Sequence, residues 1–233
     1  MPRARIHVIP TAGPDDLCGL KQLIDQADIL PDRLIAVLGK TEGNGCVNDF
    51  TRAFAVTELK RFLGSAGEDV TMVMSGGTEG ALSPHLVTFE VLDEEGKGPA
   101  MAIGAAITHD LIPSEIGTMA QVQCVSEAVR KTVGSAGIYN TEDVHFVQIK
   151  CPLLTSDRIA MSEIQTATRD TLKSMSLSRG ASALGVAVGL GEIDMKTAQQ
   201  ALRDADYTIW SGRASTSAGV ELMGHDVLVL GMS

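Results

Sequence analysis

Short apolar runs alternate along the chain with stretches whose apolar residues recur at helical spacing, which predicts a mixed α/β protein. The predicted strands cover residues 5–9, 33–38, 70–74, 86–92 and 101–108, then 144–149 and 226–230. Helices are predicted over residues 17–24, 50–63 and 115–133, and from starting points at Thr155 or Ser156 and at Ser178. Residues 86–92 and 101–108 are interpreted as a strand pair.

One set of residues occurs twice in the same order along this pattern. Lys40 ends a predicted strand and is followed by Arg52 and by Ser75, which opens Ser75-Gly76-Gly77-Thr78-Glu79. Lys150 likewise ends a predicted strand and is followed by Arg179 and by Ser217, which opens Ser217-Ala218-Gly219-Val220-Glu221. Both arginines are expected in the first turn of a helix. The repeated order indicates duplicated active-site chemistry.

A serine beside a lysine can attack a carbonyl carbon, because a neutral lysine amine can take the proton of the serine hydroxyl. Burial and a neighbouring arginine would favour the neutral amine. The small residues after each serine let backbone N–H groups approach an oxygen on which negative charge develops. Glu79 and Glu221 are interpreted either as partners of these groups or as solvated turn residues.

Composition and charge exclude several other classes of function. The net charge of −10, with no basic cluster, disfavours nucleic-acid binding, and no apolar run is long enough to predict a membrane span. No secretory leader is recognised, so we expect a cytoplasmic protein with a small-molecule partner. The four cysteines, Cys18, Cys46, Cys124 and Cys151, are too widely spaced for a zinc site, and we expect them to be packing residues, although Cys46 and Cys151 lie near the two lysines.

The repeat predicts two tandem units: residues 1–103 form the first, residues 104–136 form a connecting helix region and residues 137–233 form the second. In this interpretation residues 226–230 correspond to 101–107. The second unit would then lack the helix that follows in the first, which suggests truncation.

The motifs around both lysines and serines resemble those of the ring-opening amidohydrolases, a family that acts on cyanuric acid and barbituric acid. The resemblance rests on Gly39-Lys40-Thr41-Glu42-Gly43-Asn44-Gly45-Cys46-Val47-Asn48-Asp49, Met74-Ser75-Gly76-Gly77-Thr78-Glu79-Gly80, residues 145–155, Ser178-Arg179-Gly180-Ala181-Ser182-Ala183-Leu184-Gly185 and Ser215-Thr216-Ser217-Ala218-Gly219. It covers nearly the whole chain and is nearer to the cyanuric acid branch. It implies YjgF-like units around a pseudo-threefold axis, with sheets lining a central site and helices outside.

The resemblance also implies roles for the repeated residues. Lys150 would be the general base and Ser217 the nucleophile that opens cyanuric acid to carboxybiuret, which then loses carbon dioxide to give biuret. The remaining groups would bind the ring: Lys40 and Ser75 as a supporting dyad, the side chains of Arg52 and Arg179, and the backbone N–H groups of Gly76 and Ala218. No cofactor and no metal is assigned to this chain. A third unit, with a structural cation, would come from elsewhere, as part of a homo-oligomer or as a separate chain.

Competing functions remain open at the level of sequence. Gly39-Lys40-Thr41 is not a phosphate-binding loop, because the required earlier glycine falls at Leu34, and no Ser-x-x-Lys motif of the β-lactamase type is present. A barbiturase is one alternative. A YjgF-like protein that binds a small molecule without turning it over is another.

Overall fold

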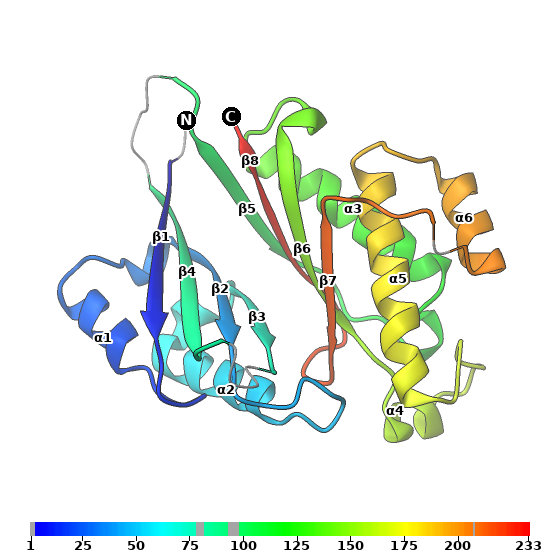
Figure 1. Ribbon diagram of the computed structural model, residues 1–233, viewed down its shortest axis with the longest axis horizontal. Helices are drawn as coiled ribbons and strands as arrows, with labels where there is room; N and C mark the ends of the chain where they lie inside the picture. The colour runs from blue at the N-terminus through cyan, green and yellow to red at the C-terminus, as the bar shows by residue number, and fades with distance from the viewer. Residues whose placement is uncertain (1–2, 78–81, 93–97, 207) are drawn as a thin grey trace. The chain divides into compact units, whose positions relative to one another are not determined.

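The computed structural model describes residues 3–77, 82–92, 98–206 and 208–233. The chain divides into two compact units, Met1–Met101 and Ala102–Ser233 (Figure 1). Each unit combines one four-stranded sheet with helices, so the expectation of a mixed α/β fold built from tandem units is confirmed. No helix among the described residues is long and apolar enough to span a membrane.

The first unit contains a mixed sheet with the strand order β1-β4-β2-β3. Its elements are β1 (Arg3–Pro10), α1 (Cys18–Asp25), β2 (Leu34–Lys40), α2 (Thr51–Leu63), β3 (Thr71–Ser75) and β4 (His85–Leu92). Strands β2 and β3 are parallel, whereas β4 is antiparallel to both β1 and β2. Leu20 of α1, Leu59 of α2 and Met74 of β3 meet in one buried apolar cluster, which fixes the helices against the sheet.

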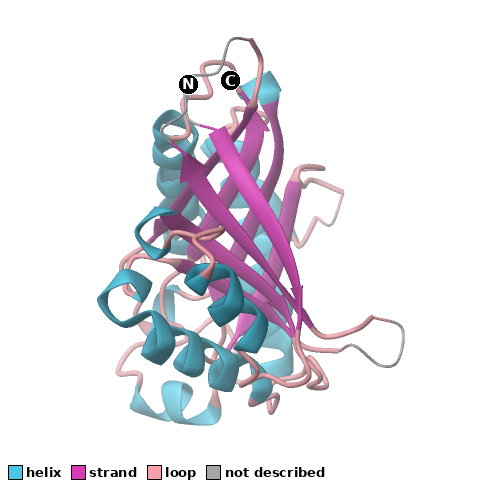
Figure 2. Cartoon of the chain, turned by 90° about the vertical axis from the view of Figure 1, so that its left-hand side faces the viewer, coloured by secondary structure: helices cyan, strands magenta, loops and turns pink. Residues whose placement is uncertain are grey.

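The second unit repeats this plan with the strand order β5-β8-β6-β7. Its elements are β5 (Met101–Ile107), α3 (Met119–Ser135), β6 (Val144–Pro152), α4 (Ser156–Met161), α5 (Thr171–Gly189), α6 (Met195–Asp204), β7 (Ala214–Gly219) and β8 (Asp226–Met232). Strands β6 and β7 are parallel, and β8 is antiparallel to β6. Figure 2 shows the strands of both units in magenta and the helices in cyan.

The two sheets correspond strand for strand: β5 takes the place of β1, β6 of β2, β7 of β3 and β8 of β4. The correspondence extends to a local irregularity. The register of β2 against β4 shifts between Leu34 and Ala36, and that of β6 against β8 shifts between Val144 and Phe146. Each shift begins six residues before a lysine, Lys40 or Lys150. Both units therefore deliver this lysine to the same position of the same fold.

This correspondence corrects three sequence-based interpretations. The predicted pairing of residues 86–92 with 101–108 is wrong, because β4 pairs with β1 and β2, whereas β5 lies beside β8. The predicted match of residues 226–230 with 101–107 is also wrong, because β8 occupies the position of β4. Helix α3, which lies in the proposed connecting region 104–136, packs against α5 inside the second unit and follows β5 as α1 follows β1. The second unit does not lack this helix.

Helix α5 begins earlier than the sequence suggested. Ser178 was expected to open it, but the helix starts at Thr171, and the side chain of Asp170 caps it by accepting a hydrogen bond from Lys173 N. Ser178 instead lies fully buried inside the helix. Serine is favoured at helix starts, yet here its hydroxyl serves a contact between helices.

That contact centres on Gln121 of α3, whose side chain is completely buried. Its Nε2 lies 2.8 Å from Ser178 Oγ, 3.0 Å from Ser182 Oγ and 3.0 Å from His225 Nε2, while its Oε1 accepts a hydrogen bond from Gly117 N at 2.7 Å. One amide thus joins α3, α5 and the segment that enters β8. An amide buried without these partners would cost free energy, so the network specifies how these elements pack.

The same network determines which ring nitrogen of His225 carries the proton. Because Gln121 donates to its Nε2, the ring proton sits on Nδ1, 3.2 Å from Thr108 Oγ1. Burial, with a smaller contribution from His109, lowers the pKa of His225 to about 4. The imidazole is therefore neutral in the native protein at neutral pH and acts as a hydrogen-bonded structural group.

We predict that Gln121→Leu lowers the free energy of unfolding by about 2 kcal/mol, because it leaves Ser178, Ser182 and His225 without their shared partner. Urea denaturation would measure the change. Gln123→Leu, at an exposed position on the same helix, is the control and should stay within about 0.5 kcal/mol of the parent protein. Equal effects of the two substitutions would contradict the structural role of the network.

We also predict that His225 makes the protein acid-labile. Above pH 6.5 the residue is neutral in both states, but below it the unfolded chain binds a proton that the native protein accepts only near pH 4. Its contribution to stability is therefore complete above pH 6.5 and is lost as the pH falls toward 4, by about 3 kcal/mol in total. Compared with the parent, His225→Gln should lose less stability between pH 7 and 4, whereas His145→Gln, at an exposed position, should follow the parent curve.

Candidate active site

In the first unit, parallel pairing places a lysine beside a serine. Lys40 is the last residue of β2, Ser75 is the last residue of β3, and the two are direct partners in the register. Lys40 Nζ lies 3.4 Å from Ser75 Oγ and donates a hydrogen bond to the carbonyl of Gly76 at 2.7 Å. The structure thus brings together the pair that the sequence singled out, at the carboxyl ends of two parallel strands.

The second unit places Lys150 and Ser217 in the same relation, as direct partners of β6 and β7. Here the lysine is almost fully buried, with 1% of its side chain exposed, and its Nζ forms an ion pair with Glu221 Oε1 at 2.9 Å. Ser217 Oγ is buried and has no hydrogen-bond partner among the described residues. The two copies therefore share a register but differ in the polar contacts that the lysine and the serine make.

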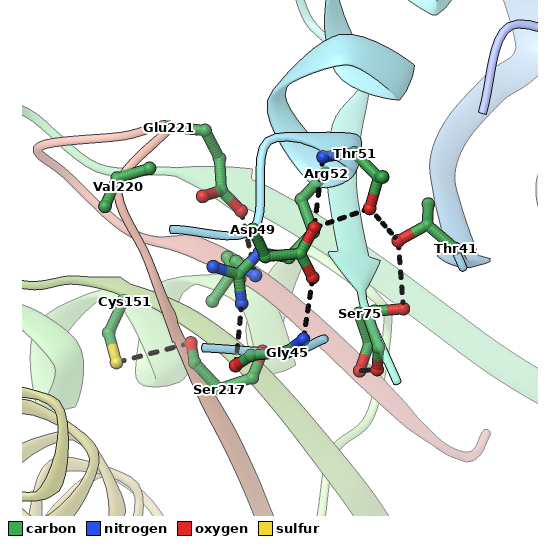
Figure 3. Close-up of polar contacts among 12 residues, drawn as sticks. Thr41, Gly45, Asp49, Thr51, Arg52, Ser75, Cys151, Ser217, Val220 and Glu221 are labelled. Atoms are coloured by element: carbon green, nitrogen blue, oxygen red, sulfur yellow. Dashed lines mark hydrogen bonds and ion pairs between the residues drawn. The ribbon is translucent and has the colours of Figure 1, made fainter. Parts of the chain in front are cut away.

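Asp49 organises the loop between β2 and α2. Its carboxylate accepts hydrogen bonds from Gly45 N at 2.8 Å, Thr51 N at 3.0 Å and Thr51 Oγ1 at 2.6 Å (Figure 3). A side chain at Gly43 or Gly76 would place its Cβ 1.8 Å from an Asp49 oxygen, so both positions require glycine. The carboxylate thus orders the loop that follows Lys40 and lies against Gly76 in the turn that follows Ser75.

The electrostatics of Asp49 show that it is charged. Burial raises the pKa of this carboxyl group, but the hydrogen bonds from Thr51 and Gly45 and the charge of Arg52 outweigh burial, so the pKa lies below its ordinary value. Asp49 also lies against the turn that follows Ser75. Its contact with Gly76, which lies 27 positions along the sequence, depends on the folding of the sheet.

The two arginines of the repeat occupy different environments. Arg52 lies in the first turn of α2, as expected, and is 3% exposed. It donates to the carbonyl of Cys46 at 2.8 Å, while its Nε is buried without a partner among the described residues. Arg179 lies in the middle of α5 and is exposed, so its expected place in a first helical turn is wrong.

Arg158 is a residue of this region that the sequence analysis missed. It lies in α4, and its guanidinium donates to the carbonyls of Leu153 at 2.7 Å and Val220 at 2.8 Å. It thereby joins the segment after β6 to the turn after β7, much as Asp49 does in the first unit. No repeated motif marks Arg158, because the first unit uses an acidic residue for the corresponding link.

Within the described part of the chain, the other candidate groups form neither an activated thiol nor a metal-binding cluster. Burial is the main cause that raises the pKa of Cys151, whose thiol is therefore protonated and lies 3.4 Å from the carbonyl oxygen of Ser217 (Figure 3). Such a thiol is not an activated nucleophile. No group of three or more His, Cys, Asp or Glu side chains within the described ranges is arranged to hold a metal ion. Glu79 lies outside the described residues.

Comparison with known proteins gives the context of this geometry. The family model described as amidohydrolase ring-opening protein matches residues 5–233. The chain is 52% identical over 242 residues to the cyanuric acid amidohydrolase of Azorhizobium caulinodans and covers 68% of that protein. It is 51% identical over 245 residues to the cyanuric acid amidohydrolase of a Bradyrhizobium species and covers 66% of it.

Solved structures agree with the sequence comparison. The crystal structure of the cyanuric acid hydrolase of A. caulinodans superimposes with a TM-score of 0.95 at 53% identity, and the match covers all of this chain and 68% of that one. A second cyanuric acid hydrolase structure, whose report describes structural concatenation, gives a TM-score of 0.94 at 40% identity. On the strength of the family match and these identities, the chain belongs to the ring-opening amidohydrolases.

Proposed function

We propose that this protein hydrolyses a C–N bond of cyanuric acid and opens the ring to carboxybiuret, which loses carbon dioxide to form biuret. The relatives named cyanuric acid amidohydrolase support this reaction. The observation that carries the proposal is the register of the parallel strands, which sets Lys40 beside Ser75 and Lys150 beside Ser217. A lysine and a serine at the same register position of adjacent strands are the parts needed to attack an amide carbonyl.

We assign the covalent step to the second unit. Ser217 Oγ has no hydrogen-bond partner among the described residues, so its hydroxyl is available to react. Lys150 serves as the general base: it takes the hydroxyl proton as Oγ attacks a ring carbonyl, and it passes that proton to the departing ring nitrogen. Water then hydrolyses the resulting acyl-serine. Ser75 Oγ, by contrast, lies within 3.5 Å of both Lys40 Nζ and the Gly76 carbonyl.

The other residues of the repeat bind the ring in this proposal. Lys40 and Ser75 polarise a second carbonyl, and the backbone N–H groups of Gly76 and Ala218 act as further donors. Arg52 supports this role because its buried Nε has no partner among the described residues and can donate to a ring oxygen. Arg179 is assigned to a ring oxygen by the family resemblance alone.

The family resemblance extends the proposal beyond this sequence. A third set of Lys, Arg and Ser, together with a structural cation, would be supplied by another copy in a homo-oligomer or by a separate chain that carries the third unit. We infer a cytoplasmic homo-oligomer with a small-molecule substrate, and size-exclusion chromatography with light scattering tests the assembly. Assays of activity therefore use the full-length protein.

We predict that Ser217→Ala lowers kcat for cyanuric acid by at least about 10³-fold while the substrate still binds, because the nucleophile is lost and the remaining contacts persist. Biuret formation measures turnover, and calorimetry measures binding. Ser75→Ala is the matched control, since it removes the equivalent hydroxyl of the other unit. It should raise KM by about tenfold and leave kcat within about tenfold of the parent value.

The same assay separates the alternatives. Turnover of barbituric acid in preference to cyanuric acid would identify a barbiturase. Binding without turnover of either ring, before and after Ser217→Ala, would identify a YjgF-like binding protein. A larger loss of kcat in Ser75→Ala than in Ser217→Ala would move the covalent step to the first unit.

A further inference from the structure

Glu221 forms a buried ion pair with Lys150 within the second unit. The Nζ and Oε1 atoms are 2.9 Å apart, and the two side chains are 1% and 7% exposed. Glu221 follows the end of β7, and its carboxylate folds back over the strand, where a Cβ at Gly219 would lie 2.1 Å from Oε2. Glycine at position 219 thus makes room for the carboxylate at the lysine.

The carboxylate of Glu221 is buried and faces the ammonium of Lys150. Neither carboxylate oxygen accepts an aligned hydrogen bond from the described residues, although both are buried. A buried carboxylate without hydrogen-bond donors is costly, and either a neighbouring cation or a proton relieves the cost. The negative charge of Glu221 can therefore be stabilised by the ammonium of Lys150, or it can be removed when the carboxylate takes the proton of that ammonium.

The first unit shows a different arrangement around its lysine. Lys40 Nζ donates to the carbonyl oxygen of Gly76, which cannot keep a proton. A carboxylate can keep one and becomes a neutral acid. The carboxylate beside Lys150 can thus store a proton, unlike the Gly76 carbonyl beside Lys40, and it stands in the unit to which the covalent step is assigned.

We propose that Glu221 is the proton partner of Lys150, a positioning residue that acts through the lysine in the proposed ring-opening reaction. In the resting protein the pair is an ammonium and a carboxylate. The proton on Nζ moves to Oε1, which leaves a neutral amine and a carboxylic acid with no change in net charge. This transfer supplies the base without exchange of a proton with solvent.

In the subsequent steps the neutral amine of Lys150 accepts and returns each proton. The amine takes the Ser217 hydroxyl proton as Oγ bonds to the ring carbon, and the ammonium gives that proton to the ring nitrogen as the C–N bond breaks. A water molecule then gives a proton to the amine as its oxygen bonds to the acyl carbon, and this proton returns to Ser217 Oγ as the ester bond breaks. Glu221 finally returns its proton to Lys150.

Several other charges act on the pair. Arg158 of α4 lies close enough to Glu221 for their charges to interact, and it favours the carboxylate and hence the resting ion pair. Asp226 of β8 is the register partner of Lys150 and favours the ammonium. The charge of Arg179 of α5 acts on the neighbouring Cys151. Among the described residues of the second unit, the titratable groups that face the pair or its neighbours are thus Arg158, Arg179, Asp226 and the protonated thiol of Cys151, with Asp110 acting on Arg158.

The test compares the full-length parent with Glu221→Gln over a range of pH. The parent obtains its base by internal transfer, so log kcat for cyanuric acid should be nearly flat around neutrality. The variant must lose the lysine proton to solvent, so its kcat should be about hundredfold lower at pH 7, rise about tenfold per pH unit and approach the parent in alkaline solution. KM should change less than about threefold, since the ring contacts remain.

Parallel profiles for Glu221→Gln and the parent, or kcat within threefold at pH 7, would overturn the proposal, because a structural role lowers activity by the same factor at every pH. Glu221→Asp keeps a carboxylate and should keep the flat profile. It carries the test if the glutamine variant does not fold, and a sloping profile would then contradict the proposal. Glu192→Gln, which removes a carboxylate paired with Arg213 in the same unit, is the control and should match the parent.

A measurement without substrate separates this proposal from the proposed function. In ¹³C NMR spectra, the Cε resonance of Lys150, assigned with Lys150→Arg, should titrate at lower pH in Glu221→Gln than in the parent, because the ammonium has lost its carboxylate. Equal midpoints would overturn the pairing. A parent protein inactive on cyanuric acid would instead refute the proposed function, and the titration would still decide the role of Glu221.

Discussion

Parallel pairing at one edge of each sheet is the constraint from which the chemistry of this protein follows. In both units a strand that ends near a lysine lies parallel to a strand that carries a serine, and the register makes the two residues direct neighbours. Side chains alternate between the two faces of a strand, so a slip of one residue would turn the lysine away from the serine. The antiparallel strand on the other side, β4 or β8, pairs along most of β2 or β6 and holds that register.

The duplication preserves the strands and changes the loops that support them. In the first unit, the carboxylate of Asp49 accepts hydrogen bonds from backbone N–H groups of the loop after Lys40 and lies against Gly76 of the turn after Ser75. In the second, the guanidinium of Arg158 makes the corresponding link through backbone carbonyls. The backbone offers both N–H donors and carbonyl acceptors, so a carboxylate can order one loop and a guanidinium can order the other. The links therefore diverged while the lysine and serine positions stayed equivalent.

Two buried polar clusters serve opposite purposes in the second unit. Around Gln121 and His225, hydrogen bonds satisfy the buried groups, and the cluster holds α3, α5 and β8 in one arrangement. Around Lys150 and Glu221, two opposite charges face each other while Ser217 Oγ has no partner among the described residues. The first cluster stabilises the fold. The second leaves hydrogen-bonding capacity unused, which is a feature of sites that react or bind a ligand.

The sequence by itself determined the local elements and the family. Apolar periodicity located β1, β2, α2 and β6, and the repeated motifs marked Lys40, Ser75, Lys150 and Ser217 as well as the resemblance to ring-opening amidohydrolases, because these signals lie within short segments. Only the tertiary structure decided which strands pair, that α3 belongs to the second unit and that Arg179 lies in mid-helix. It also decided that Asp49, Arg158 and Glu221 lie at the ends of the strands that carry the lysines and serines. These facts depend on contacts between residues far apart in the chain, and a local sequence pattern does not predict such contacts.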